Sequence, residues 1–244
     1  MDHINFENDV KLVESLGVHG LHIDIMDGHF VPRYGIYPEI VDRVNDVSNL
    51  PLDLHMMVND IFFALEQFKH IKNIEYVRFH IESCIGNEMR VVDKIRDMGA
   101  KPIACINLAT SFNTISRLVA NNEIDGVMLM GIHPGVLIQD SRPNNIVNDL
   151  KDLKHVLSGS KADSFIGLDG AVSFETIKPL SDAGINNFIG GSSSIYKGVD
   201  RKGAWDSQKE QIITNWEAIR GRGYGEGAAS FLMDDSRQHK PRKR

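Results

Sequence analysis

Apolar residues recur along this chain with two different periods. Short runs rich in Val, Ile, Leu and Met alternate with longer stretches in which apolar residues return every three or four positions, as in Val10, Val13 and Leu16. The first pattern is typical of strands and the second of amphipathic helices. The runs predict strands near residues 19–24, 51–57, 75–80, 101–107, 124–130, 164–169 and 186–190. The stretches between them predict helices over residues 6–16, 37–47, 60–69, 88–98, 112–120, 145–156, 174–183 and 205–220.

This alternation predicts parallel strands joined by right-handed crossovers. Gly17, Gly99 and Gly184 stand where helices are expected to end. A doubly wound sheet and a closed barrel both fit the order of elements. The near-eightfold repeat, the length of 244 residues and the polar residues at strand ends favour a (β/α)8 TIM barrel. Because the chain begins directly with a helix, we expect residues 1–220 to form a barrel that lacks or rearranges its first strand and has an open seam.

Polar side chains interrupt the apolar strands at their carboxyl ends. His22 and Asp24 face the same way in the first strand, His55 lies in the second, and Asp169 ends the sixth. Burying such groups is costly unless they bind something. Two imidazoles and two carboxylates at one barrel mouth predict a site for one divalent metal. Zinc and iron(II) suit these ligands best, and manganese, cobalt and magnesium remain open.

A single polar residue in a strand is more often a satisfied part of the core, and Asp27 and Asp53 fit that reading. Four such residues on three strand ends favour the metal site. A metal there can polarise a substrate carbonyl and stabilise an enediolate. Two carboxylates on opposite sides of a planar intermediate can exchange protons with it, which suits inversion at a carbon next to the carbonyl.

Two further groups of residues lie at the same ends of the strands. Met26, Met57 and Met130 are expected either to pack the core or to line the floor of a substrate pocket. The segments 170–172 and 190–194 are rich in Gly and Ser, so their amides can bind an anion, although a simple tight turn also explains them.

Composition narrows the function classes. The net charge of −6 gives no electrostatic reason to expect nucleic acid or a membrane as a partner. Cys84 and Cys105 are too few for a disulfide framework, so we expect reduced thiols and a cytoplasmic protein. No apolar run reaches membrane-spanning length. Residues 221–244 are rich in glycine and in charged residues, most of them basic. We expect them to form a disordered tail rather than a nucleic-acid-binding patch.

The motifs resemble those of the ribulose-phosphate 3-epimerase family over about residues 2–220. The matching segments are residues 22–32 (HIDIMDGHFVP), 52–58 (LDLHMMV), His133-Pro-Gly135 after Met130, Asp169-Gly170, and Gly191-Ser192. Smaller details at residues 1–6, 169–171 and 192–196 are more similar to the D-allulose-6-phosphate 3-epimerase branch than to the pentulose-phosphate branch.

The resemblance implies a metal-dependent isomerase that inverts C3 of a ketose phosphate through a cis-2,3-enediolate. The substrates it implies are ribulose 5-phosphate and xylulose 5-phosphate, or allulose 6-phosphate and fructose 6-phosphate. It also implies self-association into a homo-oligomer. Under this resemblance the roles are metal ligands for His22, Asp24, His55 and Asp169, acid and base for Asp24 and Asp169, and substrate contacts for Met26, Met57, Met130, Gly135, Gly170, Ala171, Gly191 and Ser192.

The sequence departs from the family pattern at several points. The chain starts just after the position of the family's first strand, which carries a Ser that faces the substrate. The Gly-rich loop expected after the strand ending at Met130 is replaced by residues 135–139 (GVLIQ). These departures keep a second interpretation open: a catalytically weak homologue that binds a sugar phosphate without turnover. A related decarboxylase or aldol-type barrel is disfavoured, because no lysine stands at these strand ends.

Overall fold

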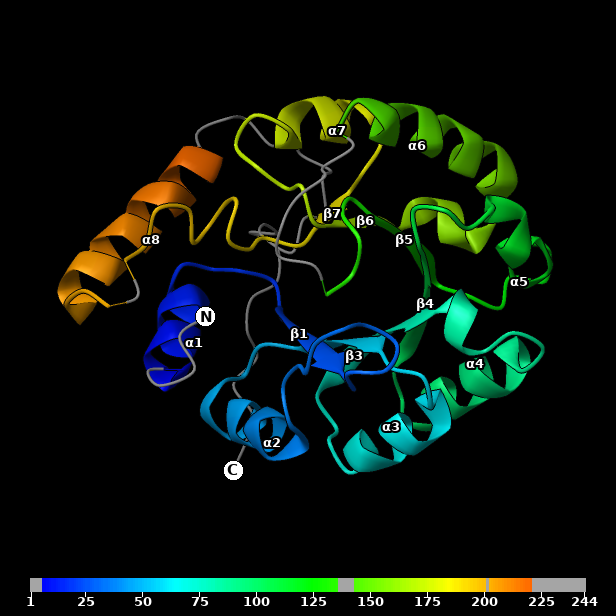
Figure 1. Ribbon diagram of the computed structural model, residues 1–244, viewed down its shortest axis with the longest axis horizontal. Helices are drawn as coiled ribbons and strands as arrows, with labels where there is room; N and C mark the ends of the chain where they lie inside the picture. Colours follow the sequence, from blue (N-terminus) through cyan, green and yellow to red (C-terminus); the bar gives the residue numbers. More distant parts are fainter. Residues whose placement is uncertain (1–5, 136–142, 201, 221–244) are drawn as a thin grey trace.

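The computed structural model describes residues 6–135, 143–200 and 202–220, and in them seven strands form one parallel sheet. Each strand pairs with the next one along the chain. The sheet curls into an open barrel, as predicted from the sequence (Figure 1). The strands are β1 (Leu21–Met26), β2 (Leu52–Met57), β3 (Ile74–His80), β4 (Lys101–Ile106), β5 (Gly126–Met130), β6 (Ile166–Asp169) and β7 (Asn187–Phe188).

The helices alternate with the strands and lie outside the curled sheet (Figure 1). Gly17, Gly99 and Gly184 follow helix ends with positive φ, which confirms their predicted capping positions. None of the described helices combines the length and apolarity that a membrane span needs. The helices are α1 (Phe6–Ser15), α2 (Pro38–Val47), α3 (Ile61–Phe68), α4 (Glu88–Asp97), α5 (Ser116–Ala120), α6 (Pro143–Leu157), α7 (Ile177–Ala183) and α8 (Trp205–Arg220).

Two predicted helices are shorter in the structure. The stretch predicted over 112–120 begins with a 3-10 turn, Phe112–Ile115, before α5. The helix predicted from residue 174 begins at Ile177, because the Thr176 hydroxyl accepts from the Ser173 amide at 2.9 Å and donates to the Ala171 carbonyl at 2.9 Å. These bonds form a turn that delays the helix.

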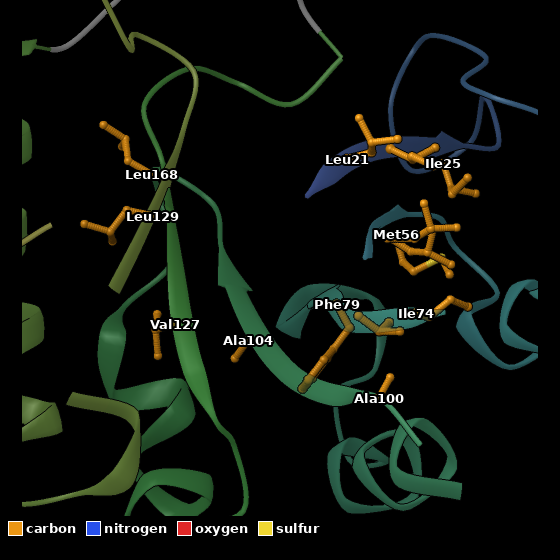
Figure 2. Close-up of a cluster of buried hydrophobic side chains, with 14 of the residues drawn as sticks. Leu21, Ile25, Met56, Ile74, Phe79, Ala100, Ala104, Val127, Leu129 and Leu168 are labelled. Carbon is orange, nitrogen blue, oxygen red and sulfur yellow. The ribbon is translucent and has the colours of Figure 1, made fainter. Parts of the chain in front are cut away.

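The two faces of the sheet have different chemistry. Alternate residues of each strand point outward and form the apolar core against the helices. Figure 2 shows such side chains from β1 to β6, among them Leu21, Met56, Phe79, Leu129 and Leu168. The inward positions carry the polar residues together with a smaller apolar cluster of Ile103, Cys105, Met128, Met130 and Ile189. The fold therefore separates a conventional core outside the barrel from a mixed interior.

The outer edge of β1 is partly paired by the loop that follows it. The amide of Ile36 donates to the carbonyl of Asp24 at 2.9 Å, and the amide of Gly35 donates to the carbonyl of Met26 at 3.1 Å. Asp27 and Tyr34 form an antiparallel bridge. In the described residues no strand joins β1 to β7, so the predicted seam is present. The returning loop satisfies part of the exposed edge.

Two segments singled out in the sequence lie outside the described residues. One is the predicted tail, residues 221–244, and the other is the altered loop after Gly135, residues 136–142. At the β1 end of the sheet, α1 packs beside α2, and Arg43 of α2 pairs with Glu7 of α1 at 2.8 Å.

Substitution of Gly35 by Ala tests the pairing of this loop with β1. A Cβ atom at Gly35 would lie 2.4 Å from the Asp24 carbonyl oxygen and 2.6 Å from the Met26 nitrogen. We expect the variant to lose about 1–3 kcal/mol of unfolding free energy, as in other overpacked sites. We also expect the amide hydrogen of Ile36 to exchange with deuterium faster than the lower global stability alone would account for.

Gly17→Ala is the matched control, because Gly17 has a φ of +82° but no atom within 4 Å of its Cβ position. This control should also destabilise the protein, with exchange at Ile36 following global stability alone. Equal exchange at Ile36 in the two variants would show that the loop is not anchored on β1.

Both cysteines are free and buried, so their thiols are expected to be unreactive in the folded protein. Burial, helped by the carboxylates of Glu88 and Glu82, raises the pKa of Cys84 to about 12. Burial also raises the pKa of Cys105, against the opposing effect of His55. Since the thiolate is the reactive form, Ellman's reagent at pH 8 should titrate neither thiol natively and both in denaturant. Rapid native reaction of either thiol would contradict this burial.

Candidate metal centre and cavity

A cavity of about 670 Å³ opens at the carboxyl ends of the strands, a size suited to a small-molecule ligand. His22, Asp24 and Asp169 line it, and His55 lies fully buried beneath them. The structure thus brings all the sequence-predicted residues to one place, while their roles as substrate contacts stay predictions. The predicted contacts that line the cavity are Met26, Met57, Met130, Gly135, Gly170, Ala171, Gly191 and Ser192.

The four candidate metal ligands meet at the floor of this cavity. His55 Nδ1 lies 3.2 Å from Asp24 Oδ1 and 3.3 Å from Asp169 Oδ2, and His22 Nε2 lies 3.4 Å from Asp24 Oδ1. One ligand atom from each of the four residues fits within 4.8 Å of all the others. Around an ion with bonds of about 2.1 Å, ligand atoms are separated by about 3.0–3.5 Å. The donor set and its spacing therefore fit one divalent cation.

Strand register explains this convergence. Asp24 and His55 are direct partners in the β1–β2 ladder, and Asp169 ends β6. All three side chains point into the barrel, so the polar groups that interrupted the sequence pattern are neighbours in space.

His22 is held by a carboxylate on its other side. Its Nδ1 lies 2.7 Å from Asp53 Oδ2, which directs Nε2 toward Asp24 and the cavity. Burial would lower the pKa of His22, but the charge of Asp53 and hydrogen bonds with Asp24 and Asp53 outweigh it and raise the pKa to about 9. A cation is therefore favoured at this position, whether it is a proton or a metal ion.

His55 and Asp24 each stabilise the charged form of the other. Burial would lower the pKa of His55, but hydrogen bonds with Asp169 and Asp24 outweigh it and raise that pKa well above its usual value. Burial would raise the pKa of Asp24, but hydrogen bonds with His22 and His55 hold it well below its usual range. Asp24 is thus an ionised carboxylate that retains 44% of its side-chain exposure, on the cavity side.

A second histidine fixes the ring of His55. The two Nε2 atoms of His55 and His80 lie 2.9 Å apart, and His80 Nδ1 lies 3.4 Å from Glu82 Oε2. Burial lowers the pKa of His80, and the contact between the two rings occupies Nε2 of His55. This leaves Nδ1 of His55 as the nitrogen that faces Asp24 and Asp169.

His55, His80 and Cys105 form another group that is close enough to hold a metal. The 2.9 Å between the two imidazole nitrogens is a hydrogen-bond distance and is shorter than two ligands of one ion prefer. We therefore interpret the His55–His80 contact as an outer support of the metal centre.

Sequence reasoning missed Arg78, His80 and Glu82. Arg78 is fully buried in β3 and donates to both carboxylate oxygens of Asp53, at 2.8 and 2.7 Å. The available signal was weaker than for His22, because Arg78 and His80 occupy inward positions of β3, a strand that also carries Glu75 and Tyr76. Asp53 is a satisfied buried group, as one reading of the sequence predicted, and it also orients His22.

The loops after β6 and β7 line the cavity, and the amide of Gly191 donates to Ser194 Oγ at 3.0 Å. Gly170 and Ala171 both have positive φ, +81° and +57°. At Gly191 a Cβ atom would meet nothing within 4 Å, so its backbone faces open space. Asn215 of α8 donates to the carbonyls of Ile195 and Lys197 at 2.9 Å and so anchors the second loop. This geometry suits an anion.

The loop after β1 folds over the other side of the mouth. The Phe30 ring packs 4.9 Å from that of His80, and Asp27 accepts hydrogen bonds from the amides of His29, Phe30 and Asn59. Asp27 is thus a local loop organiser, in line with the structural reading of the sequence. Arg33 of this loop is the only Lys or Arg among the described residues that line the cavity.

Comparison with known proteins shows the family to which this chain is similar. The sequence model of a family described as "Ribulose-phosphate 3 epimerase family" matches residues 1–196 of this chain. The chain is 33% identical over 198 residues to a ribulose-phosphate 3-epimerase of Bacillus subtilis, covering 81% of this chain and 88% of that protein. It is 29% identical over 212 residues to one of Methanocaldococcus jannaschii, covering 87% of both.

A solved structure supports the fold assignment independently. A mutant tryptophan synthase α-subunit from Pyrococcus furiosus superposes with a TM-score of 0.63 at 15% identity, covering 89% of this chain and 92% of that one. At this identity the likeness concerns architecture alone, and it agrees with the seven-stranded open barrel described above.

Proposed function

The chain belongs to the ribulose-phosphate 3-epimerase family, and on that basis we propose that it catalyses metal-dependent inversion of C3 in a ketose phosphate. Its class is that of a carbohydrate epimerase, an isomerase. The observation that carries the proposed mechanism is the meeting of two carboxylates, from Asp24 and Asp169, on one imidazole nitrogen at the floor of the cavity.

The two aspartates are the proposed acid and base. One carboxylate removes the proton from C3 on one face of the substrate, which gives a planar cis-2,3-enediolate. The other carboxylic acid then delivers a proton to the opposite face, and the configuration inverts. Asp24 and Asp169 retain 44% and 21% of their side-chain exposure, so both can reach a substrate in the cavity.

His22, Asp24, His55 and Asp169 would hold the divalent cation. When bound, this ion would stabilise the negative charge that develops on the substrate oxygens. The histidines keep the carboxylates in place: His55 contacts both, and His22 contacts Asp24. Zinc and iron(II) are the first candidates for this donor set, followed by manganese, cobalt and magnesium.

The substrate phosphate is proposed to lie against the amides of Gly170, Ala171, Gly191 and Ser192. Arg33 adds a positive charge on the facing side of the mouth. The methionines Met26, Met57 and Met130 end their strands along the same cavity and would give the reacting carbons an apolar floor.

The pentulose pair, ribulose 5-phosphate and xylulose 5-phosphate, is the first substrate to test, because the curated relatives are named for it. The hexulose pair, allulose 6-phosphate and fructose 6-phosphate, is proposed as the second, on the sequence details at residues 169–171 and 192–196.

Asp169→Asn tests the acid–base assignment. Because the amide can neither take nor return the C3 proton, we expect kcat to fall by about 10²–10⁴-fold while the circular dichroism spectrum is unchanged. Asp24→Asn should behave alike. Asp125→Asn is the control, since Asp125 pairs with Lys161 and does not line the cavity. Turnover of Asp169→Asn near the wild-type rate would refute the assignment.

Removal of the metal tests the cofactor. The isolated protein should contain about one divalent ion per chain, and a chelator that strips it should abolish epimerisation. Re-addition of zinc, iron(II) or manganese should restore the rate. Full activity in protein shown to be metal-free by elemental analysis would contradict the proposal. Binding of sugar phosphate without turnover in the loaded protein would instead support the catalytically weak homologue.

A further inference from the structure

A buried arginine crosses the interior of the barrel beneath the metal centre. Arg78 has no exposed surface, and it is the only fully buried Lys or Arg among the described residues. It starts on β3 and reaches β2 on one side and β7 on the other. Nothing in the proposed chemistry requires a cation at this depth.

Every nitrogen of the guanidinium has a contact. Nε donates to Asp53, Nη2 donates to Asn187 Oδ1 at 2.7 Å, and Nη1 donates to Met128 Sδ at 3.1 Å. Gly167 on β6 supplies the space, because a Cβ atom there would lie 2.8 Å from Nη1. The barrel interior is therefore built around this side chain.

Stability alone does not explain such an arrangement. A buried ion pair is often no more stabilising than apolar residues of the same volume, because both charges lose their hydration. Apolar residues in place of both Arg78 and Asp53 could fill this part of the interior at less cost. The pair is better explained by what else Asp53 contacts, which is Nδ1 of His22 at 2.7 Å.

We propose that Arg78 is a positioning residue for the metal ligand His22. By binding both oxygens of Asp53, Arg78 fixes the carboxylate in the orientation in which it accepts the proton of His22 Nδ1. Nε2 of His22 then points at Asp24 and the cavity. The inference rests on the proposed metal centre and adds an outer arm to it: Arg78 holds Asp53, and Asp53 holds His22.

The chemistry at this position requires arginine rather than lysine. The guanidinium binds Asp53 and Asn187 from different nitrogens at once, across the width of the barrel. An ammonium is a single point of charge and cannot reproduce both contacts in the same geometry. Arg78→Lys should therefore keep the charge and lose part of the orientation.

The experiment compares metal affinity in four full-length proteins: wild type, Arg78→Met, Arg78→Lys and Asn187→Ala. Zinc affinity is measured at one fixed pH by competition with a chromophoric chelator, and the melting temperature is measured in parallel on metal-free protein. Loss of outer-sphere partners commonly weakens metal binding by about 10–100-fold. We expect that loss in Arg78→Met and a smaller one in Arg78→Lys.

Asn187→Ala is the matched control. It removes the contact of Arg78 with β7 and leaves those with Asp53 intact. It should lower the melting temperature and leave zinc affinity within about threefold of wild type. This change is much smaller than the loss of about 10–100-fold expected when the contact between Arg78 and Asp53 is removed. Arg78→Lys keeps the test decisive if Arg78→Met fails to fold.

The outcomes separate the two proposals. Wild-type affinity in Arg78→Met or Arg78→Lys, with only a lower melting temperature, would reduce Arg78 to a structural role and overturn the inference. Equal loss of affinity in Asn187→Ala and Arg78→Lys would do the same, since it would tie binding to general stability. Failure of the wild-type protein to bind zinc or another divalent ion would instead overturn the proposed metal centre, and the arm with it.

Discussion

Charged groups inside a barrel must find partners there, and this requirement organises the whole interior of the protein. Arg78 and Asp53 neutralise each other at the centre, and Asp53 extends the network to His22. On the other side, Glu82 and His80 support His55. Both histidines thus reach the cavity floor with their rings already oriented, before any cation arrives.

The same interior contacts help an open sheet to keep its shape. β1 and β7 are the two ends of the described sheet, and no strand joins them there. The Arg78 bond to Asn187 connects β3 with β7 through the interior, while residues 34–36 pair with the outer edge of β1. The seam therefore lies between β7, which is bonded to Arg78 inside the barrel, and β1, which is paired with the loop that follows it.

Much of this arrangement follows from the sequence. Strand periodicity located all seven strands, and the inward positions of β1, β2 and β6 identified His22, Asp24, His55 and Asp169. These residues could be identified because polar groups interrupt an apolar strand pattern. Arg78 was missed because β3 is less regular, with half-buried Glu75 and Tyr76 before it, so one more polar residue did not stand out. The delay of α7 depended on side-chain bonds of Thr176, which periodicity does not record.

Epimerisation is proposed to depend on two aspartates beside one metal that exchange a proton at C3 of a ketose phosphate. The most direct test is incorporation of solvent deuterium at C3, followed by NMR, for ribulose 5-phosphate and allulose 6-phosphate with the metal-loaded protein. We predict exchange at C3 in at least one of them, with no exchange at the other carbons. Absence of exchange in both, in protein that holds its metal and binds the sugar phosphate, would contradict it.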